Sequence, residues 1–260
     1  MSKIISIHSF RGGTGKSNTT ANLSAIIAST GQRVGVIDTD INSPGIHVLF
    51  GLDEEEIQYS LNDYLWGKCE IEKAAYDVTA NLNRNLGAGA SPIPEGGKIF
   101  LIPASIKVGE IARILREGYD VGLLNDGFQN LIKELNLDVL LIDTHPGLNE
   151  ETLLSVAISD ALAIIMRPDQ QDYQGTGVTV EVARKLDVPR MLLIVNKTPQ
   201  SFDFAEVQAH VEQTYNCPVG AVLPHSDEMM TLASGGVFVL KFPDHAISQK
   251  LKNVASTLLA

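Results

Sequence analysis

The sequence predicts an α/β fold of three layers, in which a mostly parallel central sheet carries helices on both faces. Short apolar runs rich in Val, Ile and Leu recur along the chain, and segments of mixed polarity and helical length separate most of them. Runs that are apolar at every position, without polar alternation, are typical of parallel strands covered on both faces. The predicted strands are 4–7, 33–38, 99–103, 139–143, 161–166, 191–196 and 219–223.

The length and composition indicate one large domain. The chain has 260 residues, which suffices for a single well-buried core, so we expect residues 1–260 to form one domain. A net charge of −11 argues against a protein that binds nucleic acid over its whole surface. Its two cysteines, Cys69 and Cys217, lie far apart and form no metal-binding motif. With no signal peptide and no apolar run of membrane-spanning length, we expect a cytoplasmic protein.

A glycine-rich turn follows the first predicted strand and leads into a helix that starts at Lys16. Glycines allow backbone N–H groups to point at a polyphosphate, and the N-terminus of the helix adds positive potential. Lys16 supplies a full positive charge to the phosphates, and the Ser17 hydroxyl is placed to bind Mg²⁺. The residues predicted to bind nucleotide here are Gly12, Gly13, Thr14, Gly15, Lys16, Ser17 and Asn18.

This turn departs from the ordinary Walker A motif, which needs glycine at the position of Phe10. It resembles the deviant Walker A form x-K-G-G-x-x-K-[ST] of the ParA/MinD family of P-loop ATPases, with Arg11 in place of the first lysine. The segment 101–105, Leu-Ile-Pro-Ala-Ser, favours the MinD side of that family. The resemblance implies a P-loop NTPase fold of the SIMIBI type that binds ATP and Mg²⁺. It also implies that Arg11 reaches the phosphates held by a second subunit, although arginine is longer and planar.

Two acidic residues end the second predicted strand, in Asp38-Thr39-Asp40. By position in the resembling family, Asp40 would orient or polarise the attacking water, and Asp38 would support the Mg²⁺ shell or the same water. Carboxylates suit this task because hydrolysis needs a positioned water and a metal held by oxygen ligands. Taken alone, two acids after a strand are equally common as helix caps. The predicted catalytic residues are Asp40, Lys16, Arg11 and Asp38.

A second acidic motif lies at 140–147, where an apolar run is followed by Asp143 and then by Pro146-Gly147. Asp143 matches the Walker B acid, which holds Mg²⁺ through water, and Pro146-Gly147 matches the start of the switch II turn. The predicted metal ligands are therefore Ser17, Asp38 and Asp143. We interpret His145 as a hydrogen-bonded neighbour of the site in preference to a general base.

Two further motifs resemble the part of the family site that binds adenosine. Asn196, in Val-Asn-Lys at a strand end, carries a donor and an acceptor that match the adenine edge, although Asn could equally be a turn residue. The segment 223–227 resembles the loop that closes over the base and ribose, which adds Pro224 and Asp227 as candidates. The segment 167–172 lies at another strand end, where relatives build dimer and nucleotide contacts.

Other segments bear on shape and partners. Residues 53–97 interrupt the alternation, with short helices expected at 61–66 and 70–76 and a mobile loop or long hairpin connection at 87–97. An apolar stripe in the last helix is expected to pack on the core in preference to a membrane surface. A DNA-binding patch is the less favoured interpretation of a group of basic residues. The stripe is Ile247, Leu251, Val254 and Leu258, and the basic group is Arg184, Lys185, Arg190 and Lys197.

The resemblance as a whole implies an ATPase that dimerises on ATP and is stimulated by an activating adaptor protein. Such proteins position a cellular cargo, such as a chromosome, a plasmid, a division site, a flagellum or a protein compartment, on DNA or on a membrane surface. A metal-cluster or redox partner of the nitrogenase iron-protein type is an alternative, but it needs paired cysteines that this chain lacks. A biosynthetic P-loop enzyme is a further alternative. The sequence leaves the cargo, the matrix and the activating partner open.

Overall fold

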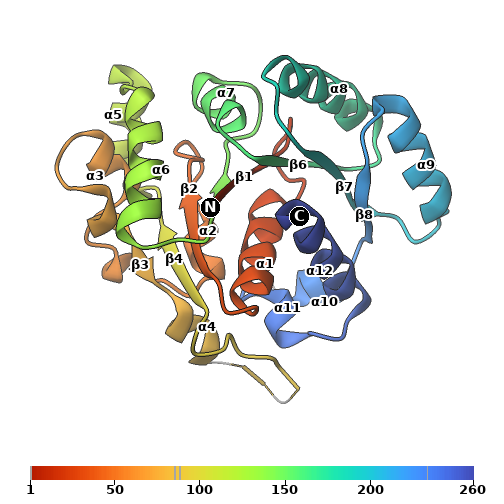
Figure 1. Cartoon of the computed structure of the whole chain (residues 1–260), viewed down its shortest axis with the longest axis horizontal. Coiled ribbons are helices and arrows are strands. Elements are labelled where there is room, and N and C mark those ends of the chain that lie inside the picture. Colours follow the sequence, from red (N-terminus) through yellow and green to blue (C-terminus); the bar gives the residue numbers. More distant parts are fainter. Residues whose placement is uncertain (1, 85, 88, 233) are drawn as a thin grey trace.

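The computed structural model describes residues 2–84, 86, 87, 89–232 and 234–260, and it contains one eight-stranded sheet between layers of helices (Figure 1). The strands are β1 (Lys3–His8), β2 (Arg33–Asp38), β3 (Tyr76–Asp77), β4 (Lys98–Ile102), β5 (Val139–Asp143), β6 (Ala161–Met166), β7 (Met191–Thr198) and β8 (Val219–Pro224). Their order in space is β3-β4-β2-β5-β1-β6-β7-β8. Every pair of neighbours is parallel except β3 and β4. The predicted three-layer α/β fold is confirmed.

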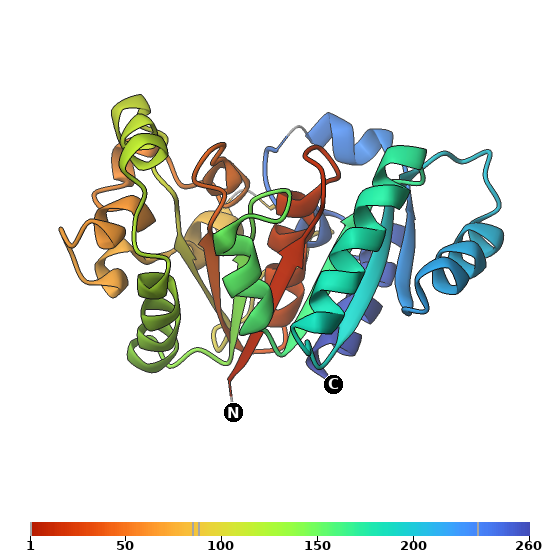
Figure 2. The same cartoon turned by 90° about the horizontal axis from the view of Figure 1, so that it is seen from above.

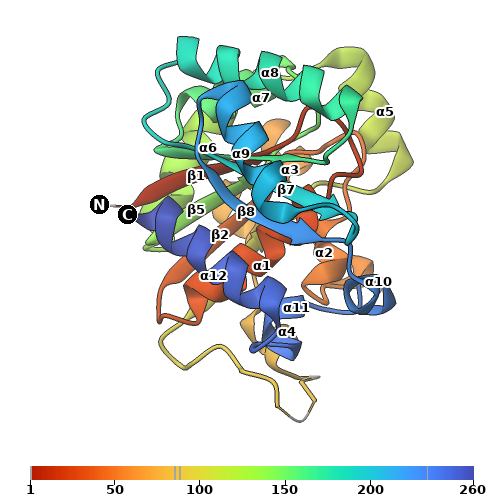
Figure 3. The same ribbon diagram turned by 90° about the vertical axis from the view of Figure 1, so that its right-hand side faces the viewer.

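The helices divide between the two faces of the sheet. Figure 3 shows the last helix and the first on one side, with those that follow β5 and β6 on the other. The helices are α1 (Lys16–Ala28), α2 (Ile46–Leu49), α3 (Leu61–Leu65), α4 (Thr79–Arg84), α5 (Val108–Glu117), α6 (Gly122–Glu134), α7 (Glu150–Ala157), α8 (Gln170–Lys185), α9 (Phe204–Tyr215), α10 (Asp227–Leu232), α11 (Phe238–Lys241) and α12 (Ala246–Leu259), with 3₁₀ turns η1 (Glu54–Glu56) and η2 (Ile71–Ala74).

The core follows the alternation of side chains along the strands. In β6, Ala163 and Ile165 face α1 and α12, whereas Ile164 and Met166 face α8 and α9. Both sets are buried, which explains why the strand is apolar at every position. Small side chains on the α1 side let that helix lie close to the sheet, so its N-terminus is held firmly beside the ends of the strands.

The strand register brings the acidic strand ends together. Asp38 of β2 is level with Asp143 of β5, and Ile7 of β1 is level with Asp143 on the other side. The loops that leave the carboxyl ends of these strands therefore share one edge of the sheet, as Figure 2 shows for the loop between β1 and α1. Ligands of open parallel sheets bind at this edge.

Residues 53–104 form the part of the fold that the sequence predicted least well. The helix expected at 70–76 is a 3₁₀ turn, Ile71–Ala74, after which Tyr76–Asp77 pairs with β4 as a short antiparallel strand. The stretch 87–97 belongs to the connection between these two strands, which agrees with a long hairpin connection; Ala88 lies outside the described residues. This connection is anchored, because Asn83 accepts a hydrogen bond from the N–H of Ile93 and donates one to its carbonyl.

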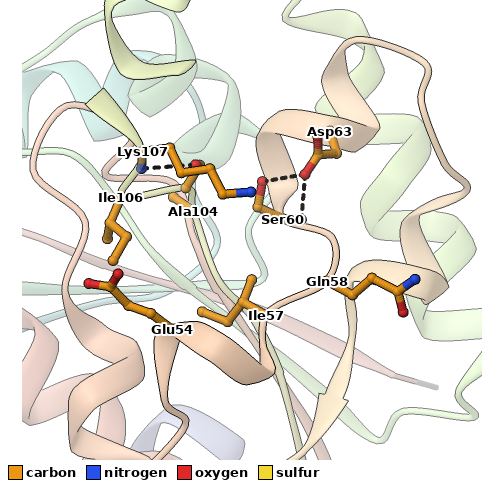
Figure 4. Close-up of a pocket in the computed structure, with 9 residues that line it drawn as sticks. Glu54, Ile57, Gln58, Ser60, Asp63, Ala104, Ile106 and Lys107 are labelled. Atoms are coloured by element: carbon orange, nitrogen blue, oxygen red, sulfur yellow. Dashed lines mark hydrogen bonds between the residues drawn. The ribbon is translucent and has the colours of Figure 1, made fainter. Parts of the chain in front are cut away.

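The segment after β4 packs against α3. The carbonyl of Pro103 accepts a hydrogen bond from the N–H of Leu61 at 2.8 Å, and the Oδ1 atom of Asn62 accepts one from the N–H of Ser105 at 2.8 Å. A cavity of about 40 Å³ remains between them. Figure 4 shows Ser60 and Asp63 hydrogen-bonded to one another at this cavity, with the side chain of Lys107 extending toward Ser60. The Leu-Ile-Pro-Ala-Ser segment thus fixes α3 to the sheet.

The last helix packs on the core, as its apolar stripe predicts. All four residues of the stripe in α12 are buried against α1, α11 and the sheet. Within the described residues, no helix has both the length and the apolar character that crossing a membrane requires.

Candidate nucleotide site

The loop between β1 and α1 has the backbone conformation that its glycines permit. Gly13 and Gly15 have positive φ angles of 78° and 99°, and the helix begins at Lys16 directly afterwards. A Cβ atom on Gly15 would lie 2.4 Å from the Nδ2 atom of Asn196. A side chain at this position is therefore excluded by both the backbone conformation and the neighbouring strand end.

The backbone amides of this loop are left without protein acceptors in the described part of the chain. Within the described residues, none of the N–H groups from Gly12 to Lys16 donates a hydrogen bond to another protein group. Gly12 and Gly13 are exposed, whereas Thr14 and Lys16 are buried. Uncommitted amides at a helix N-terminus form an anion site, and the predicted phosphate-binding residues are brought together here. Ser17 and Asn18 follow in the first turn of α1, half-buried.

Lys16 reaches the predicted Walker B acid. Its Nζ atom lies 3.0 Å from the Oδ1 atom of Asp143, and both side chains are buried. Thr20, one turn along α1, donates its hydroxyl to the same oxygen at 3.1 Å. A buried ion pair of this kind balances two charges that would each be costly alone. The sequence analysis did not identify Thr20, although its position four residues after Lys16 places it on the same face of the helix.

A second buried carboxylate lies beside this pair. Asp38 is 1% exposed, and burial together with the neighbouring charge of Asp143 raises its pKa well above the usual range. Its oxygens accept hydrogen bonds from the N–H groups of Asp40 and Gly45. The Oδ2 atom of Asp143 is buried and has no hydrogen-bond partner among the described residues.

These features fit a divalent cation. Two adjacent buried carboxylates, of which Asp38 has a raised pKa and Asp143 has an unpartnered oxygen, favour the addition of positive charge. Mg²⁺ usually takes one or two carboxylates and completes its shell with water and substrate phosphate. The Ser17 hydroxyl, at the start of α1, is the third predicted ligand.

Asp40 lies on the outer side of this group. Its Oδ1 atom accepts hydrogen bonds from both the N–H and the hydroxyl of Ser43, so the segment after β2 holds the carboxylate in place. His145 lies nearby, with its Nε2 atom 3.8 Å from the same oxygen. This distance is too long for a hydrogen bond, and the Nδ1 atom of His145 is buried without a partner among the described residues. The hydrogen bond expected for the His145 side chain is therefore not formed there.

Arg11 extends to the side of the loop. Its Nη1 atom lies 3.5 Å from Asp172 and 3.7 Å from Asp169, both at the start of α8, and the side chain is 38% exposed. Arg167 also pairs with these two carboxylates. Asp169 caps α8 by accepting a hydrogen bond from the N–H of Asp172. Individual roles in this segment could not be predicted from the sequence; in the structure, Asp169 and Asp172 hold both Arg11 and Arg167.

A cavity of about 320 Å³ lies beside the loop on the other side, lined by Gly15, Asn18, Asn196, Lys197, Pro224, His225, Ser226, Met229, Met230 and Ser234. In Asn196, the Nδ2 atom donates to the carbonyl of Thr14 at 2.8 Å and the Oδ1 atom accepts from the N–H of Lys197. Asn196 therefore ties β7 to the loop between β1 and α1 (residues 9–15), which we call the phosphate loop. Pro224 lines this cavity, whereas Asp227 is 97% exposed and lines a separate hollow.

The basic residues proposed for a DNA patch are largely engaged within the chain. Lys197 donates to the carbonyl of Gly13 at 2.8 Å, so it supports the phosphate loop. Arg184 donates to the carbonyls of Tyr215 and Asn216, and Arg190 donates to the carbonyl of Leu258. These contacts make the structural interpretation of this group the better supported one.

His8 is another residue of the site that the sequence analysis missed. It ends β1 fully buried, with its Nδ1 atom 2.7 Å from the hydroxyl of Thr144. Burial, together with the charge of Lys16 and with His145, lowers its pKa to about 3, so the ring is neutral at pH 7. Its position between a strand and the glycine-rich loop was the available sequence signal.

Comparison with known proteins agrees with this geometry. The sequence family described as an AAA domain matches residues 2–188. An uncharacterized ATP-binding protein of Methanocaldococcus jannaschii is 27% identical over 260 residues, which covers 100% of this chain and 88% of that protein. An iron-sulfur cluster carrier protein of Pyrococcus horikoshii is 28% identical over 194 residues, which covers 74% of this chain and 60% of that protein.

The fold is also found in a solved structure, that of the septum site-determining protein MinD of Pyrococcus horikoshii in complex with Mg-ADP. It has a TM-score of 0.77 and 22% sequence identity, and the match covers 99% of this chain and 96% of that one. The family match covers well over half of the chain and includes the glycine-rich loop and both acidic strand ends. The chain therefore belongs to the AAA domain family, and its fold is that of the ParA/MinD-type P-loop ATPases.

Proposed function

We propose that this chain hydrolyses ATP as a homodimer in which two subunits enclose two nucleotides, and that the change between monomer and dimer positions a cellular cargo. The observation that carries the proposal is the placement of the two cations of the loop. Lys16 lies inside the site against Asp143, whereas Arg11 lies at its rim, 38% exposed. A cation at the rim is available to phosphates bound by a second subunit.

The roles of the residues follow from their positions. The amides of the loop and Lys16 would bind the phosphates, and Asp40, held by Ser43, would orient the attacking water. Asp38 and Asp143, with the Ser17 hydroxyl, would hold Mg²⁺, which neutralises phosphate charge when bound. The cavity beside Asn196 would accommodate the base.

ATP would favour the dimer because the γ-phosphate adds anionic contacts that ADP lacks. Only a ligand with different affinities for two states can shift their equilibrium. In the dimer, the phosphate of one subunit would attract Arg11 of the other away from Asp169 and Asp172, contacts that are long and partly exposed. Slow hydrolysis would return the monomer, and an adaptor protein would accelerate that step.

Light scattering combined with phosphate release tests the proposal. The purified protein is measured with Mg²⁺ and either ATP, ADP or no nucleotide. The proposal predicts a doubled mass with ATP alone, together with slow phosphate release. A mass that does not depend on the nucleotide would contradict the dimer, and an absence of phosphate release in every condition would contradict the ATPase.

A variant that retains ATP tests whether the protein acts on DNA or on a membrane surface. Asp40→Ala protein with ATP is sedimented in parallel with DNA and with anionic liposomes. Since Lys197, Arg184 and Arg190 are engaged within the chain, neither matrix is favoured by the basic residues. Co-sedimentation with one matrix that requires ATP would identify it.

The similarity to an iron-sulfur cluster carrier keeps a second candidate function in view. Such a role needs cysteines that meet at one face. Cys69 follows α3 and Cys217 follows α9, and these two helices lie at opposite edges of the sheet (Figure 1). Iron content and colour of the protein purified without oxygen distinguish the two. A biosynthetic role is tested by asking whether small metabolites, without any partner protein, accelerate phosphate release.

A further inference from the structure

Phe10, the residue that replaces a glycine of the ordinary Walker A motif, packs directly on helix α8. A Cβ atom added to Gly175 of α8 would lie 2.1 Å from the Cδ1 atom of Phe10 and 2.4 Å from its Cγ atom. It would also lie 2.9 Å from the Cβ atom of Phe10. A change in the χ1 angle of Phe10 would move both Cδ1 and Cγ, but the position of its Cβ is set by the backbone of the loop.

The same helix also contacts the next residue of the loop. Arg11 pairs with Asp172, which lies three residues before Gly175 and thus on the same face of α8. Asp169, the residue that caps the helix, adds a second contact to Arg11. Helix α8 therefore contacts two consecutive residues at the beginning of the phosphate loop. It packs against the side chain of Phe10 and forms ion pairs with Arg11.

The backbone at Phe10 leads directly into the phosphate cradle. Ser9 donates its hydroxyl to the carbonyl of Arg11 at 2.8 Å, and its own carbonyl accepts a hydrogen bond from the N–H of Gly147 at 3.2 Å. These bonds join the loop to the switch II turn. A shift at Phe10 would move the uncommitted amides that begin at Gly12, and amides that bind phosphate work only in a narrow range of positions.

We propose that Gly175 is a positioning residue of the nucleotide site, which lets Phe10 rest on α8 and so fixes the phosphate loop in its binding conformation. The inference rests on the proposed binding of nucleotide by this loop. It assigns a role in nucleotide affinity to a helix residue that belongs to neither the loop nor the acidic strand ends. A role in helix packing alone would change stability and leave the affinity of the folded protein intact.

Calorimetric titration with Mg-ADP tests the proposal. Gly175→Ala should raise the dissociation constant by about tenfold or more, because the loop must move to accommodate the added methyl group. The matched control is Gly177→Ala on the same helix, where the nearest neighbour of an added Cβ is an atom of Tyr215 at an ordinary 3.6 Å. Both substitutions replace glycine by alanine inside α8, so the general gain in helix propensity cancels between them.

A double variant separates positioning from packing. Phe10→Gly removes both the ring and the Cβ atom that would meet the new methyl group, so the variant Phe10→Gly with Gly175→Ala should bind Mg-ADP nearly as tightly as Phe10→Gly alone. Thermal unfolding of each variant identifies those that fold. If Gly175→Ala does not fold, the double variant and Phe10→Gly carry the comparison.

Each outcome decides the question. Wild-type affinity in folded Gly175→Ala protein overturns the inference while the proposed function stands, and so does a double variant that binds much more weakly than Phe10→Gly. Rescue in the double variant with unchanged affinity in Gly177→Ala supports it. A wild-type protein that takes up no nucleotide overturns the proposed function, and the inference with it.

Discussion

The ammonium group of Lys16 lies 3.0 Å from the Oδ1 atom of Asp143, and the two side chains are 6% and 1% exposed. The residue that the resemblance assigns to phosphates is thus paired with the acid assigned to the metal. Each partner compensates the buried charge of the other. The two residues to which the resemblance assigns the ligands are therefore also paired with one another.

Lys16→Met should lower the free energy of unfolding of the nucleotide-free protein by about 3–5 kcal/mol, because it leaves the buried carboxylate of Asp143 without its cation. Urea denaturation at pH 7 measures the change. Combining it with Asp143→Asn, which removes the charge, should recover most of the loss. Lys68→Met provides a matched control, since Lys68 pairs with Asp63 but is 43% exposed, and its loss should cost at most about 1 kcal/mol. Equal costs for Lys16→Met and Lys68→Met would contradict this account.

Arg11→Ala should abolish the ATP-dependent dimer while changing the free energy of unfolding by less than about 1 kcal/mol, since its ion pairs are long and partly exposed. Light scattering with ATP measures the dimer. Arg11→Lys, which restores the residue of the family motif, should retain it. Arg113→Ala is the control for the loss of one exposed guanidinium, because Arg113 pairs with Glu117 on α5. A stable dimer of Arg11→Ala with ATP would remove the proposed role between subunits.

The sequence predicted those parts of the site that a short run of neighbouring residues specifies by itself. Gly13 and Gly15 adopt the positive φ angles that a glycine-rich turn suggests, and Asp38 and Asp143 meet because apolar strands ending in acids become neighbours in a parallel sheet. These features depend on a few adjacent residues and on a sheet topology that the family resemblance implies.

The features of the fold and the site that the sequence did not predict depend on contacts between distant parts of the chain. Neither the packing of Phe10 on Gly175 nor the pairing of Arg11 with Asp172 leaves a local signal, because each joins residues more than 160 positions apart. The strand Tyr76–Asp77 has only two residues, too few for a periodic pattern, and its pairing with β4 decides its conformation. Such features come from tertiary packing, which overrides local propensity.

Asp40→Ala should retain ATP binding and reduce phosphate release by about a hundredfold, because the attacking water loses the carboxylate that would orient it. The variant should accumulate as a dimer with bound ATP, which light scattering and nucleotide analysis of the same sample detect. Ser43→Ala, which removes one of two hydrogen bonds to Asp40, should reduce the rate much less. Undiminished phosphate release by Asp40→Ala would exclude this residue from catalysis.

His8 should make the nucleotide-free protein lose stability as the pH falls. Burial lowers its pKa in the folded state to about 3, whereas the unfolded chain takes up the proton near the ordinary value of 6.5. Between these values the unfolded state binds more protons, so the contribution of His8 is complete above pH 6.5 and declines toward pH 3. From pH 7 to pH 5 the loss amounts to about 2 kcal/mol.

Urea denaturation of wild type and His8→Asn, in EDTA without nucleotide, isolates this contribution. Asp38 acts in the opposite direction, since its raised pKa makes the folded state bind more protons than the unfolded one at mildly acidic pH. Because Asp38 is present in both proteins, its effect cancels in their difference. The free energy of unfolding of wild type should therefore fall more steeply from pH 7 to pH 5 than that of His8→Asn. Parallel profiles would show that His8 is not held neutral by the fold, since a residue with an ordinary pKa would contribute no slope of its own.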